Sequence, residues 1–183
     1  TLLIYIPAYA HHPFEVRATE SFNSIEGLLS GLAHPILGPD HFLFLLSIGL
    51  VGSLSLRRWV PLLLLSGFAG TSLSLLYPSL FTQAEVIIGL SLLGSALSAK
   101  GLIKPVVMFP LIASHGYVLG QSMIGAEPTP LMAYLLGLSI TQGITIICGC
   151  LLLSRFIQYR NVFIGCLLGA GIIFTYGAIS SLV

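Results

Sequence analysis

The sequence predicts an all-α, polytopic membrane protein with six transmembrane helices. Three observations carry this prediction: 56% of the 183 residues are hydrophobic, 7% are charged, and the mean hydropathy is +1.01. Soluble domains carry about 25% charged residues. A chain with so few charges therefore has almost nothing left over for a soluble domain.

The first ten residues, TLLIYIPAYA, resemble the end of a secretory signal peptide. An apolar run is followed by Ala-Tyr-Ala at 8–10, the small-x-small pattern that precedes a cleavage site. Cleavage there would make His11 the first residue of a single six-helix domain spanning 11–183. The alternative is that residues 1–10 are retained as an interfacial segment.

Six stretches are apolar enough and long enough to cross about 30 Å of hydrocarbon, which takes about 20 residues. The third and fourth stretches are close together but are separated by Lys100, Gly101, Lys104 and Pro105. We place the six spans near residues 26–54, 59–77, 84–100, 102–124, 130–154 and 161–182.

Basic residues follow every odd-numbered span and are absent from the connections after the second and fourth spans. The pairs are Arg57 and Arg58, Lys100 and Lys104, and Arg155 and Arg160. The positive-inside rule places these loops in the cytoplasm. We therefore expect a multi-pass protein of the bacterial cytoplasmic (inner) membrane with both termini outside.

An ionisable cluster lies inside the first predicted span, where residues 34–41 read His-Pro-Ile-Leu-Gly-Pro-Asp-His. Imidazole and carboxylate groups are costly at membrane depth, so their presence indicates a functional site. Histidine and aspartate together suit a divalent transition metal better than Mg²⁺ or Ca²⁺.

His34 and His41 cannot share one ion if they lie on a straight helix. Seven residues rise about 10.5 Å along a helix, whereas two nitrogens that ligate one ion at about 2.1 Å are at most about 4.2 Å apart. Either the helix is broken between them, or there are two sequential sites along a pore, one at His34 and one at Asp40-His41.

The intervening residues favour a break. Pro35 and Pro39 lack an N–H and clash with the preceding turn, and Gly38 tolerates unusual dihedral angles. Broken helices occur at membrane depth where they line a cavity or are buried in protein. We predict that the first span is interrupted near Gly38-Pro39 and that Asp40 lies at the N-terminus of the second half, where a negative charge is favourable.

His115 is the only other histidine within a predicted span. Gly116 and Gly120 would let the fourth span approach the first closely enough for His115 to complete the metal ligands. Met108 and Met123 are soft donors that we expect to pack or to face lipid. The polar residues that could support the ligands or line a pathway are Ser114, Gln121, Thr141 and Gln142.

His11 and His12 are predicted to lie at the outer face. If the chain begins at His11, its α-amine and imidazole could chelate a metal and serve as a capture site. The alternative is a solvated tail.

Glycine pairs four residues apart predict close helix packing. The same spacing also allows copies of the chain to associate as a homo-oligomer. The pairs are Gly27/Gly31, Gly116/Gly120 and Gly165/Gly169.

These motifs resemble the HupE/UreJ family of small nickel/cobalt permeases. The family's His-Pro-x-x-Gly-x-Asp-His motif is matched at every fixed position by His34, Pro35, Gly38, Asp40 and His41. A second, Phe-His-Gly-type motif is matched in part, by His115, Gly116 and Gly120. The departures are Ser114 in place of Phe, Leu119 where many members have a second His, and Gln121 near the place of an acid. They bear on the ligand count of the fourth span and on the choice between nickel and cobalt.

The resemblance covers essentially the whole chain and implies uptake of Ni²⁺ or Co²⁺ for enzymes such as hydrogenase or urease, or for cobalamin. We predict a secondary permease whose partners are the metal ion and the lipid bilayer, with no cofactor and no nucleic acid. The sequence contains no phosphate-binding loop, H-E-x-x-H or G-x-S-x-G motif, so no enzymatic activity is expected. The alternative function is a membrane haem protein for electron transfer, with His34 or His41 paired to His115 as axial ligands.

Overall fold

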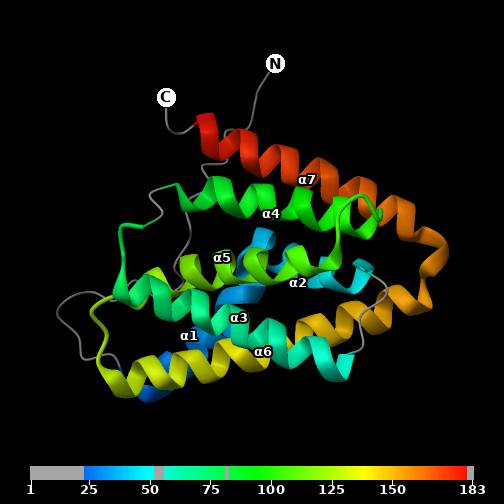
Figure 1. Cartoon of the computed structure of the whole chain (residues 1–183). Helices are drawn as coiled ribbons and strands as arrows, with labels where there is room; N and C mark the ends of the chain where they lie inside the picture. Colours follow the sequence, from blue (N-terminus) through cyan, green and yellow to red (C-terminus); the bar gives the residue numbers. More distant parts are fainter. Residues whose placement is uncertain (1–22, 52–55, 81–82, 181–183) are drawn as a thin grey trace.

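The computed structural model describes residues 23–51, 56–80 and 83–180, and within them the chain is almost entirely α-helical (Figure 1). The signal-peptide prediction and the predicted capture site at His11 and His12 lie outside the described residues. The α-helices are α1 (Ser24–Leu37), α2 (Pro39–Ile48), α3 (Leu56–Leu76), α4 (Ala84–Ala99), α5 (Met108–Gln121), α6 (Pro128–Arg155) and α7 (Arg160–Ser180). Short 3-10 turns lie at Gly49–Val51, Pro105–Val107 and Ile157–Tyr159.

The predicted break in the first span is confirmed. The helix α1 ends at Leu37, Gly38 is extended with φ −85° and ψ 106°, and α2 begins with Pro39 at its first position. A residue that precedes proline is disfavoured in the helical conformation, so the break is a local consequence of the Gly-Pro sequence. The two halves are bent by 77°. Pro35 lies inside the last turn of α1, and the helix continues past it.

The structure supports fewer spans than the six that we predicted. In the described part of the chain, three helices are long and apolar enough to cross a membrane, and the bent α1–α2 pair brings the number to four at most. The helices α4 and α5 have only 16 and 14 residues, which is about 24 and 21 Å. The predicted fourth span is shortened because the chain from Lys100 to Val107 forms a turn and a 3-10 helix around Pro105.

The helices pack mainly as three pairs, α1 with α6, α3 with α5, and α4 with α7. Glycines allow the close approach in the first pair. A Cβ atom on Gly27 would collide with the carbonyl oxygen of Pro130, and one on Gly31 would collide with that of Tyr134. The packing role predicted for Gly27 and Gly31 is therefore confirmed.

Two other glycine predictions were wrong. Gly116 and Gly120 do not bring α5 onto the first span; a Cβ atom on Gly116 would meet Gly67, and one on Gly120 would meet Ser74, both on α3. Residue spacing shows that small residues share one face of a helix, but it does not show which other helix packs on that face. Gly165 and Gly169 on α7 have open space beside them, with nothing within 4 Å.

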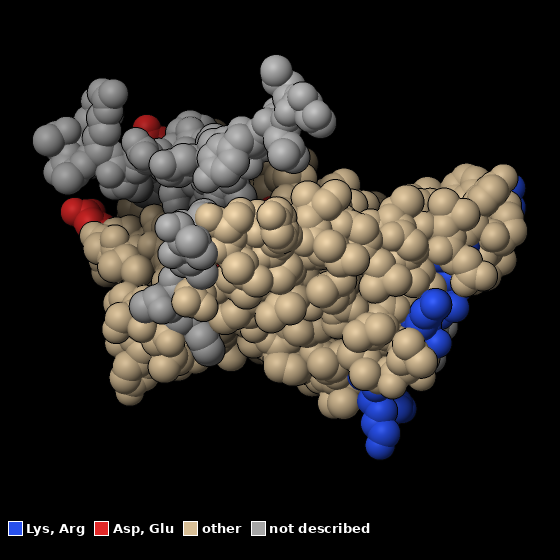
Figure 2. Space-filling model, turned by 90° about the horizontal axis from the view of Figure 1, so that it is seen from above, with Lys and Arg blue, Asp and Glu red and all other residues tan. Residues whose placement is uncertain are grey.

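The surface divides into an apolar belt and charged ends. Large hydrophobic side chains such as Leu65 on α3, Ile144 on α6 and Ile173 on α7 are exposed, as expected for helices that contact lipid. Figure 2 shows the Lys and Arg side chains gathered at one end of the molecule, away from the acidic side chains that are visible at the other. This separation of charge gives the bundle two chemically different ends.

Candidate metal centre

His41 and His115 meet in the interior of the bundle. His41 comes from the first turns of α2 and His115 from the middle of α5, and both are buried. Their Nδ1 atoms are 3.1 Å apart. The break at Gly38 directs α2 inward, so two histidines separated by 73 residues of chain face each other through their ring nitrogens.

The hydrogen-bond network assigns the proton on His115. The hydroxyl of Ser91 donates to the carbonyl oxygen of Ile88 at 2.6 Å, so its oxygen is left to accept from Nε2 of His115, 2.5 Å away. A neutral imidazole carries one N–H and one lone pair. With the proton on Nε2, Nδ1 of His115 presents its lone pair to His41.

Phe44 sets the plane of the His115 ring. Its own ring is fully buried and stacks on His115 with a centroid distance of 3.9 Å and an interplanar angle of 8°. Phe44 lies one turn after His41 on α2. The same short helix therefore supplies one imidazole and orients the other.

His34 lies beside the pair but is held by a different partner. Its ring centroid is 5.9 Å from that of His41, and its Nδ1 is 3.2 Å from the hydroxyl of Tyr134 on α6. Tyr134 donates its own proton to the carbonyl oxygen of Leu119 at 2.9 Å. The phenol oxygen therefore accepts from Nδ1 of His34, which leaves the lone pair of that imidazole on Nε2.

Asp40 places a carboxylate next to the histidine pair. Its Oδ2 atom is 3.9 Å from Nδ1 of His41, and its side chain is 25% exposed. Glu85, in the first turn of α4, is near enough to Asp40 for the two carboxylates to interact electrostatically. The histidine pair thus has an acidic, partly accessible side.

The geometry of the pair suits adjacent positions around one metal ion. Two bonds of about 2.1 Å that span the observed 3.1 Å between Nδ1 atoms enclose an angle of about 95°. This is close to the right angle between neighbouring ligands in square-planar or octahedral complexes. As the described side chains stand, no three of the His, Cys, Asp and Glu residues are grouped so that they could hold an ion together.

The other predicted polar residues lie in different environments. Thr141 donates to the carbonyl oxygen of Leu32 at 2.9 Å and so ties α6 to α1, and Gln142 is buried with no hydrogen-bond partner for its Nε2 among the described residues. Gln121 instead bonds the carbonyl of Pro78 in the α3–α4 connection, and Ser114 bonds Pro110 of its own helix.

Met108 and Met123, which we expected to pack or to face lipid, are both buried inside the bundle.

Sequence reasoning missed three residues that shape the site: Phe44, Ser91 and Tyr134. One signal was available for Ser91, because it shares a helix face with Ser95 and Ser98 at spacings of four and three residues in an otherwise apolar segment. A buried tyrosine must also place its hydroxyl on a partner. Neither pattern indicates that the partner is a histidine.

These features define a helical membrane protein with a broken helix and a buried histidine pair flanked by a carboxylate. The chain belongs to the HupE/UreJ family: the family model described as HupE / UreJ protein matches residues 1–179. No curated protein and no solved structure matches the chain.

Proposed function

We propose that this protein is a secondary permease that takes up Ni²⁺ or Co²⁺ across the cytoplasmic membrane. His41 and His115 bind the ion, Asp40 neutralises part of its charge, and His34 completes the ligands. Membership of the HupE/UreJ family supports the transport of these metals. The single observation that carries the proposal is the 3.1 Å approach of two imidazole nitrogens beside a carboxylate at a helix break.

The break also supplies the movement that binding needs. Asp40 and His34 must turn toward the histidine pair before the ion has four protein ligands. Gly38 joins α1 to α2 through one extended residue, so rotation about its dihedral angles moves the two halves relative to one another. Discontinuous helices build the ion sites of many transporters in this way.

The membrane potential is sufficient to drive uptake. Inward movement gains about 2.3 kcal/mol per charge per 100 mV. A divalent ion therefore gains about 4.6 kcal/mol at 100 mV, which corresponds to more than about a thousandfold accumulation. No ATP-binding partner is required by this energy balance.

The proposed topology retains six membrane crossings. The short helices α4 and α5 cross as part of the bundle, with the α1–α2 pair counted as one broken span. Both termini lie outside, and the end that carries Lys100, Lys104 and Arg155 faces the cytoplasm, in agreement with the positive-inside rule. His11 and His12 would then be at the outer face, available to capture the ion.

The histidine geometry suits metal transport better than axial ligation of haem. Axial ligands on opposite faces of an iron are about 4 Å apart at bond lengths of about 2.0 Å, whereas the Nδ1 atoms here are 3.1 Å apart. In addition, Phe44 stacks on His115 at 3.9 Å and occupies one face of that ring.

The test is uptake of radioactive nickel into cells that express the chain, beside cells that express His41→Ala. We expect uptake by the unchanged protein, inhibition by excess cobalt, and background uptake by the variant, with both proteins present in the membrane in equal amounts. Absence of nickel and cobalt uptake by the unchanged protein would refute the proposal.

A further inference from the structure

A stripe of buried serines runs along α4 away from the histidine pair. Ser91, Ser95 and Ser98 lie on one face of the helix and are 0%, 0% and 5% exposed. The seven residue steps from Ser91 to Ser98 rise about 10.5 Å. The stripe therefore connects the depth of the histidines to the end of α4.

Ser91 and Ser95 contact different neighbours along the way. Ser91 meets Nε2 of His115, and Ser95 donates to the carbonyl oxygen of Ser91 at 2.8 Å. The hydroxyl of Ser95 is also 3.9 Å from the sulfur of Met108, a fully buried residue at the start of α5. Hydroxyl groups of α4 and the thioether of Met108 on α5 thus follow the imidazole of His115.

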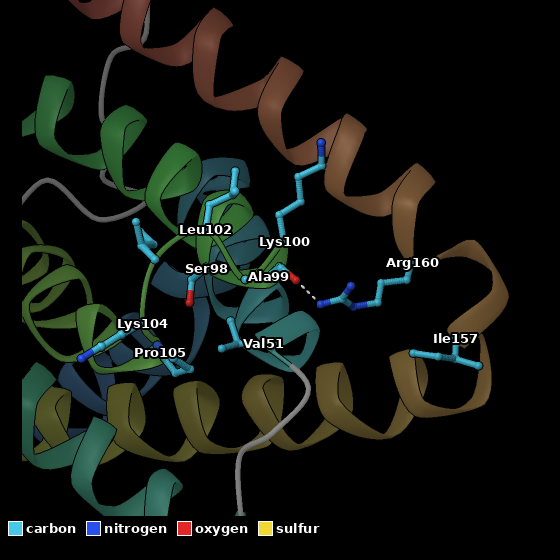
Figure 3. Close-up of a pocket in the computed structure, with 11 residues that line it drawn as sticks. Val51, Ser98, Ala99, Lys100, Leu102, Lys104, Pro105, Ile157 and Arg160 are labelled. Carbon is cyan, nitrogen blue, oxygen red and sulfur yellow. Dashed lines mark hydrogen bonds between the residues drawn. The ribbon is translucent and has the colours of Figure 1, made fainter.

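Within the described part of the chain, Ser98, the last serine of the stripe, lacks the hydrogen bond that a buried serine usually makes. A buried serine in a helix normally bonds a carbonyl in the preceding turn, as Ser91 and Ser95 do. The hydroxyl of Ser98 has no hydrogen-bond partner among the described residues, which is unfavourable for a buried polar group. Figure 3 shows this oxygen pointing into a pocket between Val51 and Pro105.

The pocket opens at the basic end of the molecule. It has a volume of about 690 Å³ and is lined by Lys100, Lys104 and Arg160 in addition to Ser98. Arg160 bonds the carbonyl oxygen of Ala99, and the ammonium groups of Lys100 and Lys104 point away from one another (Figure 3). Positive charges around the mouth disfavour retention of a cation there.

We propose that Ser95, Met108 and Ser98 form an inner transit site, on which the metal ion rests between the histidine pair and the pocket. The inference rests on the proposed function and adds the route of release to it. Neutral hydroxyl and thioether ligands bind a divalent ion more weakly than imidazole and carboxylate, which suits a site that the ion must leave. Ser95, Ser98 and Met108 are all buried in this structure, so release requires the surrounding helices to move.

The test compares binding with transport in the variant Ser98→Ala/Met108→Leu. Removal of an unpartnered hydroxyl and a volume-conserving exchange for methionine are both well tolerated by folded proteins. We expect the purified variant to bind Ni²⁺ with a Kd within about twofold of the unchanged protein. In cells, its maximal rate of nickel uptake should fall about tenfold. The matched control is Ser139→Ala/Met132→Leu on α6, which makes the same chemical changes away from the stripe and should transport normally.

The outcomes separate this inference from the proposed function. Uptake by the Ser98→Ala/Met108→Leu variant at the rate of the unchanged protein would overturn the inner transit site and leave the permease intact. Loss of nickel binding together with uptake would also overturn it, because the residues would then act through the histidine pair. An unchanged protein that neither binds nor transports nickel would refute the permease, and the inner transit site with it. If the double variant fails to insert, Ser98→Ala and Met108→Leu are tested singly by the same criteria.

Discussion

The histidines on the two sides of the break at Gly38 have different partners. On the α1 side, His34 donates from Nδ1 to Tyr134. On the α2 side, the Nδ1 atom of His41 faces another imidazole nitrogen rather than a hydroxyl. A nitrogen that donates to a phenol is committed to an N–H, whereas two facing nitrogens can share a proton or a metal ion. Hydrogen-bond partners, not residue type, thus distinguish His34, whose Nδ1 donates to a phenol, from His41 and His115, whose Nδ1 atoms face each other.

Removal of either member of the pair is expected to have the largest effect. His41→Ala and His115→Ala should each lower nickel uptake by at least about a hundredfold, which is the upper end of the cost of losing a supporting partner. His34→Ala should cost less, about tenfold. Uptake rates normalised to the amount of protein in the membrane give the ranking. If His34→Ala lost as much nickel uptake as His41→Ala, or more, the predicted greater importance of the pair would be wrong.

The pH dependence of nickel uptake should arise mainly from protonation of His41 and His115. Histidine must be neutral to ligate a metal, so uptake should fall as the pH falls through about 6. We expect a decrease between about pH 7.5 and 5.5, because both imidazoles of the pair must be neutral to ligate the ion. His34→Gln should keep this pH profile at a lower overall rate. Uptake that stays constant down to pH 5 would contradict ligation by histidine.

Ser91, which bonds His115, should contribute more to nickel binding than Tyr134, which bonds His34. Ser91→Ala removes the oxygen that accepts from Nε2 of His115, and we expect the KM for nickel to rise about tenfold. Tyr134→Phe removes the oxygen that accepts from Nδ1 of His34 and should raise the KM less. The dependence of uptake on nickel concentration measures both. Ser139→Ala is the control, because Ser139 bonds the carbonyl oxygen of Leu135 in its own helix, and a similar rise in that variant would show a general packing effect.

The smallest effect is expected at the break itself. The dihedral angles of Gly38 are open to any residue, but a Cβ atom there would lie 3.1 Å from both Oδ1 of Asp40 and Cδ2 of His41. Gly38→Ala should therefore displace these groups and cost about 1 kcal/mol, or about fivefold in nickel affinity. Equilibrium binding to the purified protein measures the change. Gly165→Ala, with nothing within 4 Å of the added atom, should bind nickel normally.

Local chemistry made part of this protein predictable. The break at Gly38-Pro39 and the position of Asp40 in the first turn of α2 follow from the steric effect of proline on its neighbours. The burial of His34, His41 and His115 follows from their place in apolar segments. Each of these features depends on residues a few positions apart, which a single sequence displays directly.

Only the tertiary structure decided which surfaces meet. Gly116 and Gly120 form a helix face of small residues, and α3 rather than the first span packs on it. Ser91 and Tyr134 became partners of His115 and His34 because α4 and α6 lie beside them. Apolar helices of similar composition can pair in many ways, and the choice depends on the close packing of the whole bundle. The sequence by itself therefore determined a broken, histidine-bearing membrane helix, and the packing of the other helices determined which nitrogen faces which partner.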